Sequence, residues 1–110
     1  MRVLLVEDDR DQLRLLEMLV ENAGHEAVVC ATVACARASE PCDLALVDCH
    51  LLDGDGIELA RSLGGAVYVL TGDESVESEQ GFQVLRKPVR MAELTAILGD
   101  AGILGDTSSD

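Results

Sequence analysis

Five short, continuous apolar runs constrain the fold of this chain more than any other feature. They are VLLV (3–6), AVVC (27–30), LALV (44–47), VYVL (67–70) and the dipeptide VL (84–85). Continuous rather than alternating apolar runs are typical of strands buried on both faces, as in a parallel sheet. The sequence therefore predicts five short parallel strands.

The segments between these runs have helical patterns with recognisable ends. Candidate helices cover residues 10–23 between Asp9 and Gly24, residues 33–39 after Thr32, a short stretch from Asp55 to Gly64, and residues 90–98 before Gly99. Asp and Thr are good N-terminal caps, and Gly commonly ends a helix. Strands alternating with helices predict a three-layer α/β domain, in which right-handed crossovers place helices on both faces of the sheet.

One connection is too short for a full helix. Only eleven residues, 72–82, lie between Thr71 at the end of the fourth strand and Gln83 at the start of the fifth, and they carry almost no apolar stripe. A parallel crossover needs about a dozen residues. We therefore expect a shortened or irregular fourth helix. We also expect one domain over residues 1–104, followed by a flexible tail, residues 105–110.

The charge of the chain excludes several classes of partner. The 110 residues carry a net charge of −13. Nucleic-acid binding needs Lys and Arg to replace the counterions of phosphates, and anionic lipid attracts basic segments. We therefore expect neither a nucleic acid nor a membrane as a partner.

The four cysteines, Cys30, Cys35, Cys42 and Cys49, form no C-x-x-C pair, and their spacings match no usual zinc site. We expect them to be reduced and to pack as small hydrophobic residues. The opening apolar run is too short for a signal peptide or a spanning helix. The sequence therefore predicts a cytoplasmic protein.

Carboxylates follow two of the predicted strands directly. Glu7 and Asp8 come after the first run, and Asp48 comes after the third. Ligands of open parallel sheets bind beyond the carboxyl ends of the strands. If the first and third strands are neighbours, the three acids converge, with Thr71 and Lys87 beside them at the ends of the fourth and fifth strands.

Three converging carboxylates repel one another unless their pKa values rise or a cation lies among them. Hard oxygen ligands favour Mg²⁺, which often shares its coordination with a phosphate. A lysine and a hydroxyl nearby would complete a site for a phosphoryl group. The sequence therefore predicts phosphoryl chemistry at this edge of the sheet.

The same residues carry a family resemblance. LLVEDD, LVDCHLLDGDG, VLTG and VLRKP resemble, in this order, the motifs of the response-regulator receiver domain of two-component signalling, the CheY-like family. The resemblance covers about residues 2–98. It implies a flavodoxin-like (βα)5 sandwich with parallel sheet order 2-1-3-4-5.

The resemblance also implies a role for each site residue. Asp48 would be the phospho-acceptor, with Lys87 and Thr71 binding the phosphoryl group and a cis bond joining Lys87 to Pro88. The Mg²⁺ ligands would be Glu7 (through water), Asp8, Asp48 and the main-chain carbonyl of His50. The donor would be a histidine kinase or a histidine phosphotransfer protein. The chain would then be a phospho-acceptor rather than an enzyme, apart from catalysing its own phosphorylation and dephosphorylation.

The sequence departs from the usual receiver pattern in three ways. Val84 stands where most receivers have an aromatic residue, and Phe82 is a poor substitute because we expect it to precede the strand. The fourth helix is reduced, as in a subgroup whose fourth strand ends in Phe-Ala-Thr-Gly-Tyr, of which only Thr-Gly is present here. Leu52 replaces a frequent proline, which should loosen its loop slightly. We expect the signal to pass through ordering of residues 72–82.

Three other interpretations compete with this one. An aspartyl-nucleophile phosphatase would need a second acid two residues after Asp48, where His50 stands. A calcium loop counted from Asp53 would need glycine where Glu58 stands. A phosphorylation-independent pseudo-receiver, acting purely as an interaction module, stays open because of Val84 and the short crossover. The sequence leaves open whether the chain is a single-domain regulator or part of a hybrid kinase.

Overall fold

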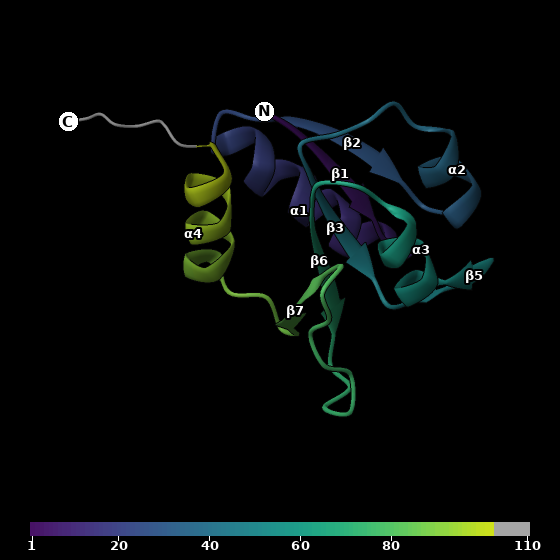
Figure 1. Cartoon of the computed structure of the whole chain (residues 1–110). Coiled ribbons are helices and arrows are strands. Elements are labelled where there is room, and N and C mark those ends of the chain that lie inside the picture. The colour runs from purple at the N-terminus through teal and green to yellow at the C-terminus, as the bar shows by residue number, and fades with distance from the viewer. Residues whose placement is uncertain (103–110) are drawn as a thin grey trace.

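The computed structural model describes residues 1–102 and contains a five-stranded parallel sheet (Figure 1). The sheet order is β2-β1-β3-β6-β7, which confirms the expected order of the five successive sheet strands. The strands are β1 (Arg2–Val6), β2 (Glu26–Cys30), β3 (Leu44–Asp48), β6 (Ala66–Thr71) and β7 (Gln83–Arg86). Each predicted apolar run lies inside one of these strands. The flavodoxin-like three-layer fold is therefore correct.

Within residues 1–102, four helices cover the sheet: α1 (Arg10–Asn22), α2 (Val33–Ala38), α3 (Gly56–Ser62) and α4 (Met91–Gly102). The side chains of Asp9, Thr32 and Asp55 cap the first three helices as expected. Gly24, with φ of 91°, follows the end of α1. The expectation that Gly99 ends the last helix is wrong, because α4 continues to Gly102.

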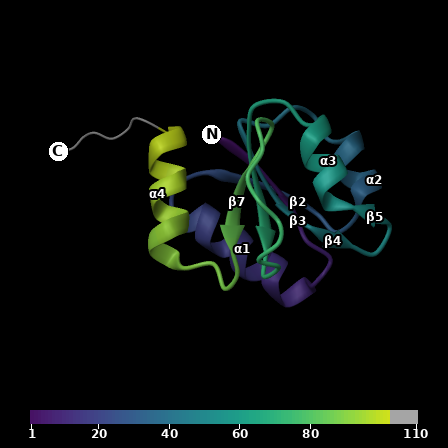
Figure 2. The same ribbon diagram turned by 60° about the horizontal axis from the view of Figure 1, so that its bottom comes forward.

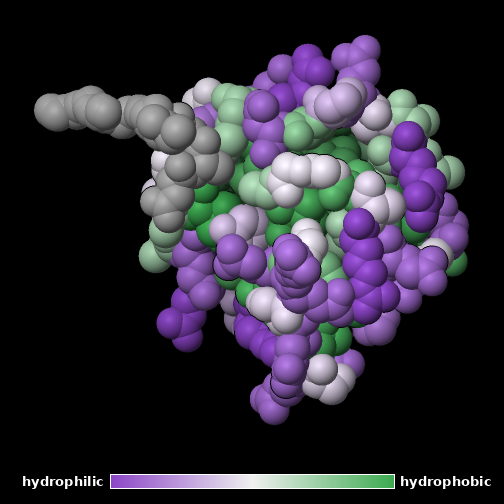
Figure 3. All heavy atoms as spheres, viewed as in Figure 1, coloured by the Kyte–Doolittle hydropathy of each residue, from purple (hydrophilic) through white to green (hydrophobic). Residues whose placement is uncertain are grey.

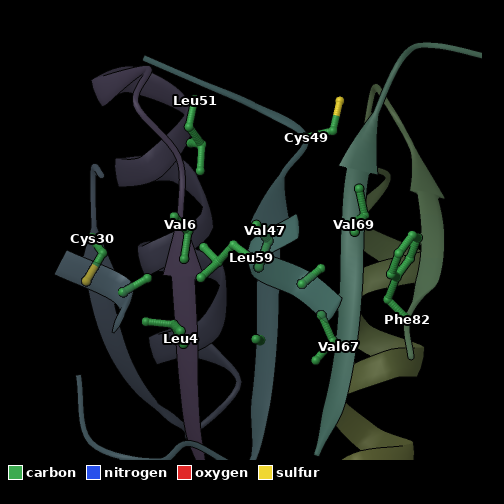
Figure 4. Packing of buried hydrophobic residues seen from close by; sticks show 13 residues of the cluster. Leu4, Val6, Cys30, Val47, Cys49, Leu51, Leu59, Val67, Val69 and Phe82 are labelled. Carbon is green, nitrogen blue, oxygen red and sulfur yellow. The ribbon is translucent and has the colours of Figure 1, made fainter. Parts of the chain in front are cut away.

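The core consists of two apolar layers, one on each face of the sheet. One layer packs α2 and α3 against the sheet, and the other packs α1 and α4 against the opposite face (Figure 2). Figure 4 shows the first layer, in which Leu59 from α3 lies among Leu4, Val6 and Val47. Both faces of β1 and β3 are therefore buried, which explains their continuous apolar sequences.

The fourth crossover, within the described chain, contains no helix, so the expected shortened or irregular helix is not formed there. Residues 72–82 leave β6, project past its carboxyl end and return to β7 (Figure 1). A bridge between Glu79 and Phe82 closes the return turn. Phe82 does precede β7, as expected, but its side chain is only 3% exposed and packs into the core. An aromatic side chain thus fills space at the edge of the sheet where a helix is missing.

Two features of the fold were not expected. A small antiparallel hairpin, β4 (His50–Leu51) and β5 (Gly54–Asp55), connects β3 to α3. Cys30 and Cys35 form a disulfide, so the expectation of four reduced cysteines is wrong for this pair. The end of β2 and the first turn of α2 bring the two Cα atoms to 5.5 Å, a distance suited to a disulfide. Cys42 and Cys49 are free.

Two other expectations concern the membrane and the C-terminal tail. Among the described residues, no helix is both long and apolar enough to cross a bilayer. The predicted tail, residues 105–110, lies outside the described part of the chain.

Candidate functional site

Two neighbouring strands bring the predicted acids together. In the pairing of β1 with β3, Val6 lies opposite Val47, so the residues that follow, Glu7 and Asp48, are adjacent. Glu7, Asp8 and Asp48 each place a carboxylate oxygen within 4.8 Å of the other two. The sequence-based prediction that these three acids converge is therefore correct in geometry.

The cluster is largely removed from solvent. Glu7 is 2% exposed and Asp48 is 6% exposed. Burial, followed by the negative charge of Asp48, raises the pKa of Glu7 above its ordinary value near 4.5. Both causes penalise the ionised carboxylate. A cation at this position would relieve the same penalty.

Lys87 supplies one cation. Its Nζ lies 2.9 Å from Oδ1 of Asp48 and 3.4 Å from Oε1 of Glu7. Burial works to lower the pKa of Lys87, but the hydrogen bond and charge of Asp48, followed by the charge of Glu7, raise it. The peptide bond between Lys87 and Pro88 is cis, as the sequence motif implied. Lys87 therefore stays charged and holds one oxygen of Asp48.

Thr71 lies at the end of β6 with its side chain buried. Its main-chain carbonyl accepts a hydrogen bond from the amide of Lys87 at 2.9 Å, which joins the ends of the fourth and fifth sheet strands. Its Oγ1 accepts a hydrogen bond from the amide of Asp73 at 2.9 Å. The hydroxyl proton of Thr71 can still be donated, since accepting a bond does not use it.

The hairpin after Asp48 contacts one member of the acid pair, Glu7 and Asp8, directly. The amide of Leu52 donates a hydrogen bond to Oδ2 of Asp8 at 2.9 Å. A proline at position 52 could not make this bond because it has no amide proton. The expectation that Leu52 only loosens the loop is therefore wrong: its amide fixes Asp8 to the hairpin. That the main-chain carbonyl of His50 is an Mg²⁺ ligand stays a prediction, because no hydrogen bond of the described chain bears on it.

Gly56 is a site residue that the sequence reasoning missed. A Cβ atom at this position would lie 1.9 Å from the main-chain oxygen of Asp48. The first turn of α3 therefore packs directly against the backbone of the candidate acceptor, and only glycine permits this approach. The repeated Asp-Gly pattern of residues 53–56 was the available signal, but it marks a turn equally well.

Comparison with known proteins decides the family. No family model matches the sequence. The response regulator receiver protein CpdR of Brucella abortus (strain 2308) is 32% identical over 109 residues, which cover 84% of this chain and 89% of the relative. The chain belongs to the response-regulator receiver family.

Solved receivers have the same fold. The CheY-like receiver domain protein of Methanospirillum hungatei JF-1 superimposes with a TM-score of 0.80 at 28% identity, covering 90% of each chain. The CheY-like receiver domain of Methylobacillus flagellatus gives a TM-score of 0.79 at 22% identity, covering 92% of this chain and 98% of the other. Its low identity supports the fold alone.

The donor set of this receiver suits a hard divalent cation. Ionised, the three carboxylates of the cluster carry three negative charges, and Lys87 balances one of them. Oxygen ligands with residual negative charge are what Mg²⁺ prefers. The residues present therefore fit Mg²⁺, which would bind at Glu7, Asp8 and Asp48.

Proposed function

We propose that Asp48 accepts a phosphoryl group from a phosphohistidine. An oxygen of its carboxylate attacks phosphorus, the phosphorus–nitrogen bond breaks, and the donor histidine leaves. The product is an acyl phosphate on Asp48, and the receiver is then a signalling switch rather than an enzyme acting on other molecules. The observation that carries this proposal is the contact of the Lys87 ammonium with an Asp48 carboxylate that lies within 4.8 Å of two further acids.

The surrounding side chains have separate roles in this proposal. Lys87 neutralises the oxygens of the transferred phosphoryl group, and the Thr71 hydroxyl donates a hydrogen bond to it. Glu7, Asp8, Asp48 and the main-chain carbonyl of His50 hold Mg²⁺, which when bound neutralises charge on the transferring group. Burial of Glu7 and Asp48 keeps water from screening these charges.

The partner of this chemistry is a histidine kinase or a histidine phosphotransfer protein. The proposal includes no nucleic-acid or membrane partner, and it places the chain in the cytoplasm as a receiver domain over residues 1–104. The phosphoryl group adds a charge of about −1.5 to −2 beside Thr71. We propose that this charge reorders residues 72–82, because the Thr71 hydroxyl is bonded to the amide of Asp73 in that segment.

The test is covalent labelling with a small phosphodonor such as acetyl phosphate, followed by intact mass. The wild-type chain should gain one phosphoryl group in the presence of Mg²⁺ and none when the metal is chelated. Asp48→Asn should gain none under either condition.

The matched control is Asp55→Asn, which changes a nearby acid in the same way. Asn is as good a helix cap as Asp, so α3 is retained, and we expect normal labelling. Persistent labelling of Asp48→Asn would contradict the proposal. If the wild-type chain stays unlabelled, the pseudo-receiver interpretation is favoured. Release of inorganic phosphate from other phosphoesters would favour the phosphatase.

A further inference from the structure

The disulfide between Cys30 and Cys35 lies close to the acidic cluster. Cys30 ends β2, with its side chain 2% exposed, and Cys35 lies in α2 with its residue exposed to solvent. The bond therefore joins the end of an edge strand to the first helix after it. Figure 4 shows the Cys30 side chain at the β2 side of the apolar layer.

Cys30 contacts the acid pair through the backbone. The amide of Glu7 donates a hydrogen bond to the carbonyl of Cys30 at 3.0 Å. The end of β2 thus helps to hold the Glu7 backbone in place.

Cys35 is linked to Asp8 indirectly, through α2 and the hairpin. The carboxylate of Asp53 accepts hydrogen bonds from the amides of Val33 and Ala34, at 2.8 and 3.2 Å. Its neighbour Leu52 donates its amide to Asp8. The contacts form a closed circuit that runs from Glu7 to Cys30, across the disulfide into α2, and back through the hairpin to Asp8.

The weakest part of this circuit is α2. It has six residues, and Ala36 is the only one of them that is buried. A helix this short does not persist through its own hydrogen bonds. Its order depends on the Thr32 cap, on Asp53, on the disulfide and on the packing of Val33 and Ala36 in the apolar layer. Opening the disulfide therefore loosens the link that holds Asp8.

We propose that Cys30 and Cys35 are a reversible thiol–disulfide pair that sets how firmly the acid pair is held for Mg²⁺. The inference rests on the proposed function, because it assigns the metal to that cluster. The oxidised chain binds Mg²⁺ more tightly because its ligands are preorganised. The reduced chain needs more Mg²⁺ to reach the same rate of phosphorylation.

The oxidant is a low-molecular-weight disulfide such as oxidised glutathione. The thiolate of the exposed Cys35 attacks one sulfur of the oxidant and releases one glutathione thiolate. The thiolate of Cys30 then attacks the Cys35 sulfur and releases the second. Two protein thiols are oxidised, one glutathione disulfide is reduced to two thiols, and two protons leave the protein thiols.

The first measurement is the redox state itself. Full alkylation of the denatured chain should modify two thiols, Cys42 and Cys49, in the oxidised form and four in the reduced form. The change between these masses should follow the ratio of reduced to oxidised glutathione and should reverse. A chain that stays at four thiols at every ratio would overturn the proposal.

The second measurement is hydrogen exchange, which does not depend on phosphorylation. Reduction should speed exchange about tenfold in residues 31–38 and in the hairpin, residues 50–55, and leave β3 unchanged. Cys35→Ser should behave like the reduced chain under both conditions. Cys42→Ser, the matched control, should retain the difference between the two states. Equal exchange in the oxidised and reduced chains would contradict the circuit.

The third measurement is the Mg²⁺ concentration that gives half of the maximal labelling rate. We expect it to rise about threefold to fivefold on reduction. In Asp53→Ala the disulfide should still form, but this difference should vanish because the circuit is cut. Labelling with identical Mg²⁺ dependence in both states would overturn the inference alone. Absence of labelling in both states would overturn the proposed function, and hydrogen exchange would still test the circuit.

Discussion

Two crossovers of this receiver connect neighbouring parallel strands in different ways. The third, residues 49–65, connects β3 to β6 through a hairpin and α3, and it buries Leu59 and Ala60 against the sheet. The fourth, residues 72–82, connects β6 to β7 without a helix. Figure 3 shows that the lower edge of the molecule, where the fourth crossover projects, is largely hydrophilic. The third crossover is held by apolar packing, whereas the fourth is held by Phe82 where it returns to the sheet and by polar contacts before that residue.

The polar contacts of the fourth crossover come largely from two arginines. Arg86 donates hydrogen bonds to the carbonyls of Asp73, Glu74 and Val76. Arg61, on α3, binds both carboxylate oxygens of Glu79 at 2.9 and 2.7 Å. Exposed polar contacts each contribute little to stability. The polar part of the fourth crossover can therefore reorganise at low cost while the third crossover stays fixed.

The largest effect is expected in the third crossover, from Gly56→Ala. The added Cβ would lie 1.9 Å from the main-chain oxygen of Asp48, so backbone must move. Overpacking usually costs about 1–3 kcal/mol, and we expect about 4 kcal/mol here because no flexible side chain can yield. Urea unfolding measures the loss.

The matched control is Gly72→Ala in the fourth crossover. A Cβ there meets nothing within 4 Å, so the change in stability should stay within about 0.5 kcal/mol. Similar losses for the two variants would mean that the two crossovers are packed alike at these glycines.

Phe82→Ala is expected to have the next largest effect, because Phe82 is the one fully packed side chain of the fourth crossover. Removing a buried aromatic side chain costs about 3 kcal/mol or more. Val84→Ala, on a half-buried neighbour in β7, should cost clearly less. Urea unfolding of both variants measures the difference. A small loss for Phe82→Ala would show that polar contacts alone hold this crossover.

The general fold could be predicted because its evidence is local. Each buried strand is an apolar run, and each of the first three helices has its capping residue in place. The convergence of Glu7 and Asp48 followed once the first and third strands were taken as neighbours, because parallel strands end at one edge. The length and polarity of residues 72–82 predicted a shortened or irregular helix between the fourth and fifth sheet strands, and the structure has no helix there at all.

The missed features depend on distances between segments that the sequence does not encode locally. The Cys30–Cys35 bond depends on where β2 ends relative to α2. The role of the Leu52 amide depends on how the hairpin folds back to Asp8.

The wrong helix end at Gly99 has a local cause. Gly99 resembled a helix end, but a glycine within a helix costs only about 1 kcal/mol and the helix continues.

Glu7→Gln tests the acidic cluster, where the ends of both crossovers meet. The pKa of Glu7 is raised in the folded chain, so folding favours its protonated form. The free energy that protonated Glu7 contributes to folding is fully present below its pKa in the unfolded chain, near 4.5. It is lost as the pH rises through the higher pKa of Glu7 in the folded chain. Without metal, Glu7→Gln should therefore become more stable relative to wild type as the pH rises from 4 to neutrality.

Mg²⁺ should reverse the order of stability of the wild-type chain and Glu7→Gln at neutral pH. The cation compensates the ionised Glu7 in the wild-type chain and gains less from a neutral glutamine. Thermal unfolding at several pH values, with chelator and with excess Mg²⁺, measures both effects. A difference between wild type and Glu7→Gln that does not change with pH would show that Glu7 keeps an ordinary pKa.

The smallest effect on global stability is expected from Arg86→Lys, which retains the charge and removes the guanidinium fork that binds three carbonyls. A lysine is a point charge and cannot reproduce this fork. The global free energy of unfolding should fall by less than about 0.5 kcal/mol because the residue is exposed. Local opening of residues 72–77 should become about tenfold more frequent. Lowering the free energy of local opening by about 1.4 kcal/mol raises the population of the open form by a factor of ten.

Hydrogen exchange measures global unfolding and local opening in one experiment. Amides of residues 72–77 should exchange faster in Arg86→Lys, while those of β3 and α3 should not change. Arg90→Lys is the matched control, because the Arg90 guanidinium makes no hydrogen bond with any other described residue. Uniformly faster exchange across the sheet would mean that the fourth crossover is part of the cooperative core. It could not then reorganise independently, and the proposed route of the signal through residues 72–82 would fail.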